Sequence, residues 1–203
     1  ELDLDGQVSG AIATDRVIGC VLHLGATIAA PGVIRHVADG RLILGEARGP
    51  GSRRLDALVE AFAPTTLRAT ATPDIRREIW VKLLGNVNFN PITALTGATN
   101  RQVGADAAAR KLCADMFDEV AEAGRRLGLE PGMSAAARID LGASLGDFKT
   151  SMLQDFEHGR RPEIDAIVGA AAAIGRALDV PMPMTEAVLA LVRLKAKVMR
   201  LAS

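Results

Sequence analysis

The chain changes its hydrophobic periodicity near residue 72. Before that point, short β-rich apolar runs such as residues 16–24 alternate with turn residues, which is typical of strands. From Pro73 onward, apolar residues recur at every third or fourth position, which is typical of amphipathic helices. The change predicts an α/β segment over residues 1–72, followed by an all-helical domain over residues 73–203.

The α/β segment contains three short apolar runs, at residues 16–24, 32–36 and 41–44. Asp39-Gly40 separates the last two runs, and this dipeptide between apolar runs predicts a hairpin turn. A helix is expected over residues 55–62, and a short strand over residues 66–71. In the second domain, a first helix is expected to start near Pro73 and to include residues 79–100. Further helices are expected over residues 105–127, 135–145, 163–178 and 185–201.

The expected helix over residues 79–100 carries a polar row on an apolar surface. At 100° per residue, Lys82, Asn86 and Asn90 follow one another along one face. Lys82 falls at the edge of the apolar stripe, and Asn90 falls inside it. The stripe itself consists of Ile79, Trp80, Leu83, Leu84 and Val87. A buried amide without partners costs about 1–3 kcal/mol, so either a neighbouring helix or a ligand must meet this row.

Pro91 directly follows the row and removes one backbone hydrogen bond, which predicts a kink. A kink beside buried polar side chains favours a functional site. The structural alternative stays open at this point. It consists of a solvated Lys82 and two asparagines that bond to neighbouring helices.

A second group of polar residues surrounds two expected helix starts. Ser151, with Gln154 three residues later, has the form of a capping box. A helix start also attracts anionic groups, so Ser151 could hold a carboxylate. Pro162 suits a first helical position, and Glu163 suits the positive end of a helix dipole. Capping alone would explain both Ser151 and Glu163.

Composition excludes several classes of function. Lys plus Arg and Asp plus Glu both number 24, and aromatic residues are 3%, so neither bulk charge nor stacking favours a nucleic-acid partner. No apolar run approaches the roughly 20 residues of a membrane span, and no signal peptide is recognisable. Cys20 and Cys113 predict two reduced thiols in a cytoplasmic protein. The histidines His23, His36 and His158 are too scattered for a metal site, so no metal is expected.

The sequence motifs taken together resemble the 2-dehydropantoate 2-reductases, or ketopantoate reductases. The resemblance is carried by KLLGN at 82–86, NPITAL at 90–95, SMLQD at 151–155 and EID at 163–165. It covers essentially the whole chain. It implies an α/β remnant of a Rossmann-type nucleotide-binding domain over residues 1–72. An all-α C-terminal helical domain, similar to that of 6-phosphogluconate dehydrogenase, would follow over residues 73–203.

The resemblance also implies an activity and a cofactor. Members of this family reduce ketopantoate to pantoate with NADPH, on the route to coenzyme A, in a cleft between the two domains. Lys82 would be the general acid, and Glu163 would lie near the nicotinamide and fix the geometry of Lys82. Ala26 would contact the cofactor through its backbone. A cytoplasmic homodimer is expected.

The remaining implied roles concern the substrate. Asn86, Asn90 and Asn100 would hydrogen-bond its oxygens and terminal hydroxyl. Ser151 would hold its carboxylate. Bound in this way, the substrate would meet the polar row that is otherwise costly to bury.

The sequence departs from the family pattern at the cofactor. No Gly-x-Gly-x-x-Gly follows a strand, and the chain begins at Glu1 without a methionine. We therefore expect it to be part of a longer protein and to bind NADPH poorly alone. Two alternatives remain: a reductase of another 2-oxo acid, and a non-catalytic helical dimerisation module with residues 166–175 and 186–201 as its interface. Lys82, Asn86 and Glu163 discriminate between catalysis and such a module, which needs none of them.

Overall fold

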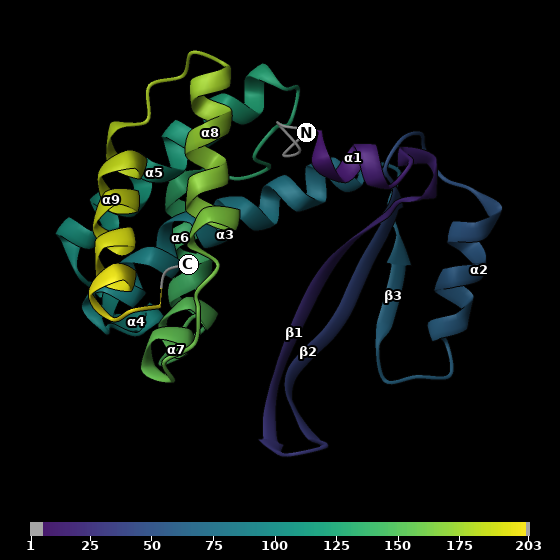
Figure 1. Cartoon of the computed structure of the whole chain (residues 1–203), viewed down its shortest axis with the longest axis horizontal. Helices are drawn as coiled ribbons and strands as arrows, with labels where there is room; N and C mark the ends of the chain where they lie inside the picture. Colours follow the sequence, from purple (N-terminus) through teal and green to yellow (C-terminus); the bar gives the residue numbers. More distant parts are fainter. Residues whose placement is uncertain (1–5, 202–203) are drawn as a thin grey trace. The chain divides into compact units, whose positions relative to one another are not determined.

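The computed structural model describes residues 6–201, so Glu1 lies outside the described residues. Two compact units divide the chain, the first ending at Ile79 and the second beginning at Trp80 (Figure 1). The division falls inside the helix α3, Ile75–Thr96, which starts in the first unit and continues into the second. The assignment of residues 1–72 and 73–203 to two functional domains stays a prediction.

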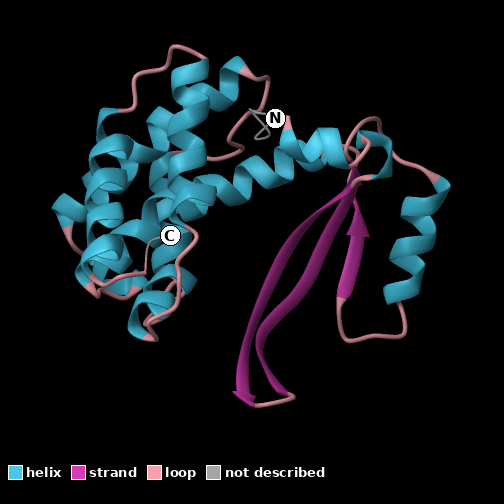
Figure 2. Ribbon diagram, viewed as in Figure 1, coloured by secondary structure: helices cyan, strands magenta, loops and turns pink. Residues whose placement is uncertain are grey.

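The first unit is built on a three-stranded sheet (Figure 2). Its strands are β1 (Ile18–Ala30), β2 (Val33–Glu46) and β3 (Arg68–Ala71), preceded by α1 (Gln7–Ala11) and a 3-10 turn at Thr14–Arg16. β1 and β2 are antiparallel, whereas β3 runs parallel to β2. A parallel pair needs a crossover, which the helix α2 (Arg53–Phe62) supplies. The predicted α/β character is confirmed.

The predicted hairpin turn at Asp39-Gly40 is wrong. The turn lies at Pro31-Gly32, where Gly32 has a φ of 77° that favours glycine. Gly40 instead lies inside β2, where the pairing passes from Arg41–His23 directly to Asp39–Leu24. Gly40 is thus the extra residue of a β-bulge, with a φ of 127°.

The second unit is all-helical, as the periodicity predicts. After α3 come α4 (Asn100–Ala105), α5 (Ala107–Arg126), α6 (Ala135–Ala143), α7 (Ser151–Glu157), α8 (Ala170–Ala177) and α9 (Pro183–Val198). A π-helical segment at Asp165–Gly169 leads into α8. Among the described residues, no helix is long and apolar enough to cross a membrane.

The core of the second unit forms between α3, α5, α7, α8 and α9. Its largest cluster includes Trp80, Phe117, Met152, Val168 and Val192, all of which are buried. The start of α9 is fixed by a carboxylate from α5. Glu119 accepts hydrogen bonds from the backbone nitrogen of Met184 at 2.8 Å and that of Thr185 at 2.9 Å. These bonds satisfy amides that a helix start leaves unpaired, and they position α9 on α5.

Candidate functional site

The polar row of α3, which consists of Lys82, Asn86 and Asn90, becomes more buried along the helix. Lys82 and Asn86 are half-buried, and Asn90 is only 5% exposed. The buried position predicted for Asn90 is confirmed. Ile79, expected in the apolar stripe, is 42% exposed, so that expectation is wrong. At about 100° per residue, Ile79 falls between Asn86 and Asn90 around the helix, so it lies on the side of the polar row.

The asparagines of α3 differ in whether their side chains have hydrogen-bond partners. Asn88 is fully buried, and its amide nitrogen donates to the carbonyl of Cys113 at 3.3 Å. Its side-chain oxygen accepts from the Phe89 backbone nitrogen at 2.7 Å. The side chains of Asn86 and Asn90, by contrast, make no hydrogen bond with the described residues. The structural alternative, in which both bond to neighbouring helices, therefore does not hold within the described part of the chain.

Asn100 is partly satisfied. Its side-chain nitrogen donates to the carbonyl of Gly142 at 3.2 Å, and its backbone nitrogen donates to that of Phe148 at 3.1 Å. The side-chain oxygen is buried and has no partner among the described residues. One acceptor of Asn100 is thus left for another donor.

A chain of hydrogen bonds ties the start of α7 to the backbone of the polar row. The backbone nitrogen of Leu153 donates to the Thr150 hydroxyl at 3.3 Å. The hydroxyls of Thr150 and Thr93 are 2.6 Å apart, and Thr93 donates to the backbone carbonyl of Asn90 at 3.1 Å. Such a chain is mutually polarising and holds α7 on α3.

Ser151 is therefore not the N-cap, contrary to the capping-box prediction. Thr150 takes that role, because Thr93 holds its buried hydroxyl where the Leu153 amide can donate to it. Ser151 becomes the first residue of α7 and is exposed. Its hydroxyl makes no hydrogen bond with the described residues. Capping does not explain Ser151, and its hydroxyl remains available to a ligand.

Glu163 lies just before the π-helical segment and is exposed. Its backbone carbonyl accepts from the Ile167 backbone nitrogen at 3.2 Å. The carboxylate makes no hydrogen bond or ion pair with a described residue, so Lys82 is not its partner in this structure. The α-helix expected from Glu163 opens instead as a π-helical turn, a form that often occurs at functional sites.

A guanidinium that sequence reasoning missed lies against the same helix. A Cβ added to Gly85 would stand 1.5 Å from Nη2 of Arg138, so the arginine head packs directly on the α3 backbone. Its Nε is buried without a partner among the described residues, and burial lowers the pKa of Arg138. Gly85 is three residues from Lys82 and therefore its neighbour on the helix surface. The available signal was Gly85 itself, since an isolated glycine in a helical pattern often has a packing reason.

The predicted site residues thus fall into two groups. Ala26 lies on β1 in the first unit and is exposed. The others all belong to the second unit, where hydrogen bonds join Thr93 to Thr150 and the Asn100 backbone nitrogen to the Phe148 carbonyl. Within residues 6–201, no group of three or more His, Cys, Asp or Glu side chains could hold a metal ion.

The arrangement suits a small polar anion. It contains the ammonium group of Lys82. It also contains the side-chain amides of Asn86 and Asn90 and the hydroxyl of Ser151, which make no hydrogen bond with the described residues. Arg138 adds a second cation beside the row. Charged donors with neutral amides between them can bind a carboxylate and orient the oxygens next to it.

Comparisons with known proteins agree with this chemistry. Residues 74–196 match the family model described as "Ketopantoate reductase PanE/ApbA C terminal". A 2-dehydropantoate 2-reductase of Mesorhizobium japonicum is 45% identical over 192 residues, which are 95% of this chain and 59% of that protein. One from Archaeoglobus fulgidus is 30% identical over 88% of this chain and 60% of its own length.

A solved structure gives the same result. The crystal structure of 2-dehydropantoate 2-reductase from Methylococcus capsulatus superposes with a TM-score of 0.86 at 30% identity, covering 99% of this chain and 69% of that one. The chain spans about 60% of the length of the curated relatives that it matches. Because the family model covers more than half of the chain, the chain belongs to the ketopantoate reductase family.

Proposed function

We propose that the gene product containing this chain reduces 2-dehydropantoate to pantoate with NADPH, a step of coenzyme A biosynthesis, with Lys82 as the general acid. The observation that carries the proposal is the polar row, where Asn86 and Asn90 have no side-chain partner among the described residues. Relatives named 2-dehydropantoate 2-reductase support the substrate. A homodimer and a cytoplasmic location stay predictions.

The chemistry of Lys82 follows from its charge and position. A bound nicotinamide would supply the hydride for C2 of a 2-oxo acid, and the residues of this chain would have to stabilise the negative charge on the carbonyl oxygen. The Lys82 ammonium donates a proton to that oxygen and stabilises its charge, and such acid catalysis contributes about 10²–10⁴-fold. Asn86 and Asn90 would hold the substrate hydroxyl and carbonyl along the row. Ser151 would bind the carboxylate, and the unpaired side-chain oxygen of Asn100 would accept a hydrogen bond from the terminal hydroxyl.

Two further side chains would support the reaction. Glu163 would orient the Lys82 ammonium once substrate is bound, although its carboxylate has no partner among the described residues. Arg138, packed on Gly85, adds positive charge beside Lys82 and would strengthen the binding of an anionic substrate. Ala26 would contact the cofactor from the first unit.

The described residues fit the substrate better than the cofactor pyrophosphate. In the first unit, Ser52 caps the start of α2, and the carboxylate of Glu46 accepts from both Ser52 and Arg54. The hydrogen bonds from Arg54 and Ser52 lower the pKa of Glu46 to about 2, so this group is negative at neutral pH. A fixed carboxylate at a helix start opposes a phosphate there. The start of α2 is therefore already paired within the chain, by Ser52 and by the ion pair between Arg54 and Glu46, and is not an open pyrophosphate site.

Replacement of Lys82 tests the proposal. In the complete gene product, Lys82→Ala should lower the turnover of ketopantoate by at least about a hundredfold, because the proton donor is removed. Steady-state oxidation of NADPH measures this effect. Lys111→Ala is the matched control, since Lys111 is exposed on α5 and pairs with Asp115 at 2.6 Å. Near-normal turnover of the Lys82 variant would contradict the general-acid role.

A further inference from the structure

Two buried threonines stand between residues that are proposed to bind the substrate. Thr93 on α3 is fully buried, and Thr150, the N-cap of α7, is 5% exposed. Thr93 lies three residues after Asn90, and Thr150 directly precedes Ser151. The sequence predicted no role for either threonine. Their contact therefore joins the polar row to the start of α7.

The hydrogen bonds of this pair run in one direction. A hydroxyl group has a single proton to donate. Thr93 donates its proton to the Asn90 carbonyl at 3.1 Å, so the Thr150 hydroxyl must donate across the 2.6 Å between the two side-chain oxygens. The Thr150 oxygen in turn accepts from the Leu153 backbone nitrogen at 3.3 Å. Each hydroxyl is thus both donor and acceptor, and neither can turn without losing a bond.

Packing alone does not require these hydroxyls. A valine has nearly the shape of a threonine, and two valines would fill the same space without needing hydrogen-bond partners. A buried hydroxyl is costly unless it meets its partner, so the pair favours only the arrangement of α3 and α7 in which the two oxygens meet. The pair therefore fixes the position of Ser151 relative to Asn90.

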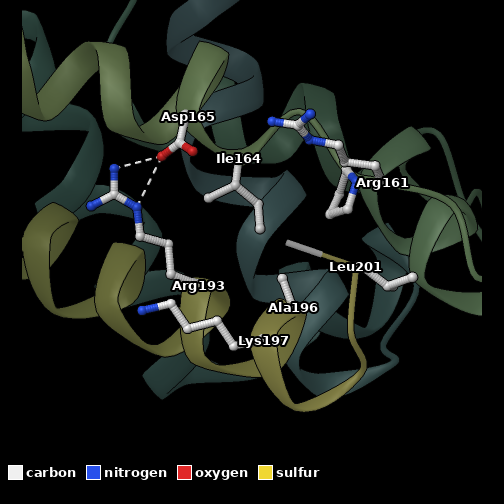
Figure 3. A pocket seen from close by; sticks show the side chains of 8 residues that line it. Arg161, Ile164, Asp165, Arg193, Ala196, Lys197 and Leu201 are labelled. Carbon is white, nitrogen blue, oxygen red and sulfur yellow. Dashed lines mark hydrogen bonds and ion pairs between the residues drawn. The ribbon is translucent and has the colours of Figure 1, made fainter. Parts of the chain in front are cut away.

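The other end of α7 is held by α9. The Lys195 ammonium donates to the carbonyl of Ala94 on α3, and it lies 5.0 Å from the ring centre of Phe156 on α7. α9 is itself anchored, because Nε of Arg193 donates to the carboxylate of Asp165 at 2.9 Å (Figure 3). With its far end held in this way, α7 depends on the threonine pair for the placement of its start.

We propose that Thr93 and Thr150 are positioning residues. Their hydroxyl pair fixes the start of α7, so that the Ser151 hydroxyl meets the carboxylate of a 2-oxo acid whose other oxygens lie along the polar row. The inference rests on the proposed function, from which it takes the contact between Ser151 and the substrate. It adds that a buried hydroxyl pair sets the distance between the serine and the asparagines.

Loss of one hydroxyl tests this role in the complete gene product. Thr93→Val should raise the KM for ketopantoate about tenfold and lower kcat less than about threefold, because the contact of Ser151 with the carboxylate is the same before and during the reaction. Thr93→Ser keeps the hydroxyl and should leave KM within about twofold of the original value. Steady-state oxidation of NADPH measures both constants. An unchanged KM in Thr93→Val, or an equal rise in Thr93→Ser, would overturn the proposal.

A double variant shows whether Thr93 acts through Ser151. In the Ser151→Ala background, Thr93→Val should raise KM less than about twofold further, since no hydroxyl is left to position. A further tenfold rise would overturn the proposal. Thr150→Val breaks the same bond from the side of α7 and should raise KM as Thr93→Val does, so it replaces Thr93→Val if that variant does not fold.

Thr185→Val is the matched control. Thr185 is also fully buried, and its hydroxyl donates to Glu119 on α5 at 2.7 Å. This variant should lower Tm and leave KM within about twofold of the original value. An equal rise in KM would assign the effect of Thr93→Val to a general loss of stability and overturn the proposal.

Hydrogen exchange of the Leu153 amide gives a second readout that needs no turnover. This amide donates to the Thr150 hydroxyl, so it should exchange at least about tenfold faster in Thr93→Val and change less than about threefold in Thr185→Val. NMR of samples transferred to deuterated buffer measures the rates, and an unchanged rate in Thr93→Val would overturn the proposal. If the unmodified protein does not reduce ketopantoate, the proposed function is refuted, and the exchange rate alone decides whether the pair holds α7.

Discussion

Two faces of α3 use the same amino acid for opposite purposes. Asn88 is buried, and both ends of its amide have protein partners, from Phe89 and from Cys113 on α5. Asn90, two residues later, is nearly as buried but makes no side-chain hydrogen bond with the described residues. Positions two residues apart point about 200° away from each other on a helix, so they meet different surroundings. The comparison separates an asparagine whose side chain is bonded within the fold from one whose side chain has no partner among the described residues.

The largest expected difference is between the alkylation rates of the two cysteines. It tests whether α5 covers the side of α3 on which Asn88 bonds to Cys113. Burial raises the pKa of the Cys113 thiol to about 12, so at pH 8 only about one molecule in 10⁴ is the reactive thiolate. Cys20 is exposed. Alkylation with iodoacetamide at pH 8 should therefore modify Cys20 at least about 1,000-fold faster than Cys113, as mass spectrometry of timed samples would show.

Denaturation is the control for this contrast. In concentrated guanidinium chloride, both thiols should react at similar rates, because the burial that raises the pKa of Cys113 is lost. Comparable rates in the native protein would show that α5 does not close this face of α3.

Removing the side-chain amide of Asn90 should lower activity and leave stability unchanged. Asn90→Leu should lower kcat/KM for ketopantoate about tenfold to a hundredfold, as expected for one or two lost hydrogen bonds to an oriented substrate. The free energy of unfolding should stay unchanged or rise, because an unpaired buried amide is replaced by an apolar group. Steady-state kinetics and thermal unfolding of the same samples measure both effects. A stability loss with intact kcat/KM would instead make Asn90 structural.

At Asn88, whose side chain has two hydrogen-bond partners, a loss of stability is expected. Asn88→Ala should lower the free energy of unfolding by about 1–2 kcal/mol, because the buried carbonyl of Cys113 loses its donor. This corresponds to a decrease in Tm of about 2–8 °C for a chain of this size. Thermal unfolding measures it, with Asn86→Ala as the matched control that should change Tm little. Equal losses for both variants would remove the distinction between the two faces.

The sequence was sufficient for the overall architecture and for the polar row. Periodicity predicted the α/β segment and the helices that follow, and the helical wheel placed Asn90 among buried residues. The sequence could not show that the side chain of Asn88 has hydrogen-bond partners and that of Asn90 has none among the described residues. The partner of Asn88 is a carbonyl on α5, 25 residues along the chain, and only tertiary packing brings it near.

Two of the wrong predictions have the same origin. Asp39-Gly40 has the local pattern of a turn, but the pairing of β1 with β2 makes Gly40 a bulge and leaves the turn to Gly32. Ser151 and Thr150 are both capable N-caps, and contact with Thr93 on α3 decides in favour of Thr150. In both cases the local signal was real, and a contact distant in sequence determined its role.

The smallest expected effect concerns the missed guanidinium of Arg138. In Gly85→Ala, the new Cβ would stand 1.5 Å from Nη2, so the arginine head must move off the helix. The stability should change by less than about 1 kcal/mol, because the displaced group is the end of a flexible side chain and alanine favours the helix by about 1 kcal/mol over glycine. The KM for ketopantoate should rise about threefold to tenfold if the cation assists substrate binding beside Lys82. Arg138→Met should reproduce that rise without the added Cβ. If KM rises only in Gly85→Ala, the effect comes from the helix backbone. If KM is unchanged in both variants, Arg138 lies outside the site, and substrate recognition is limited to the polar row and Ser151.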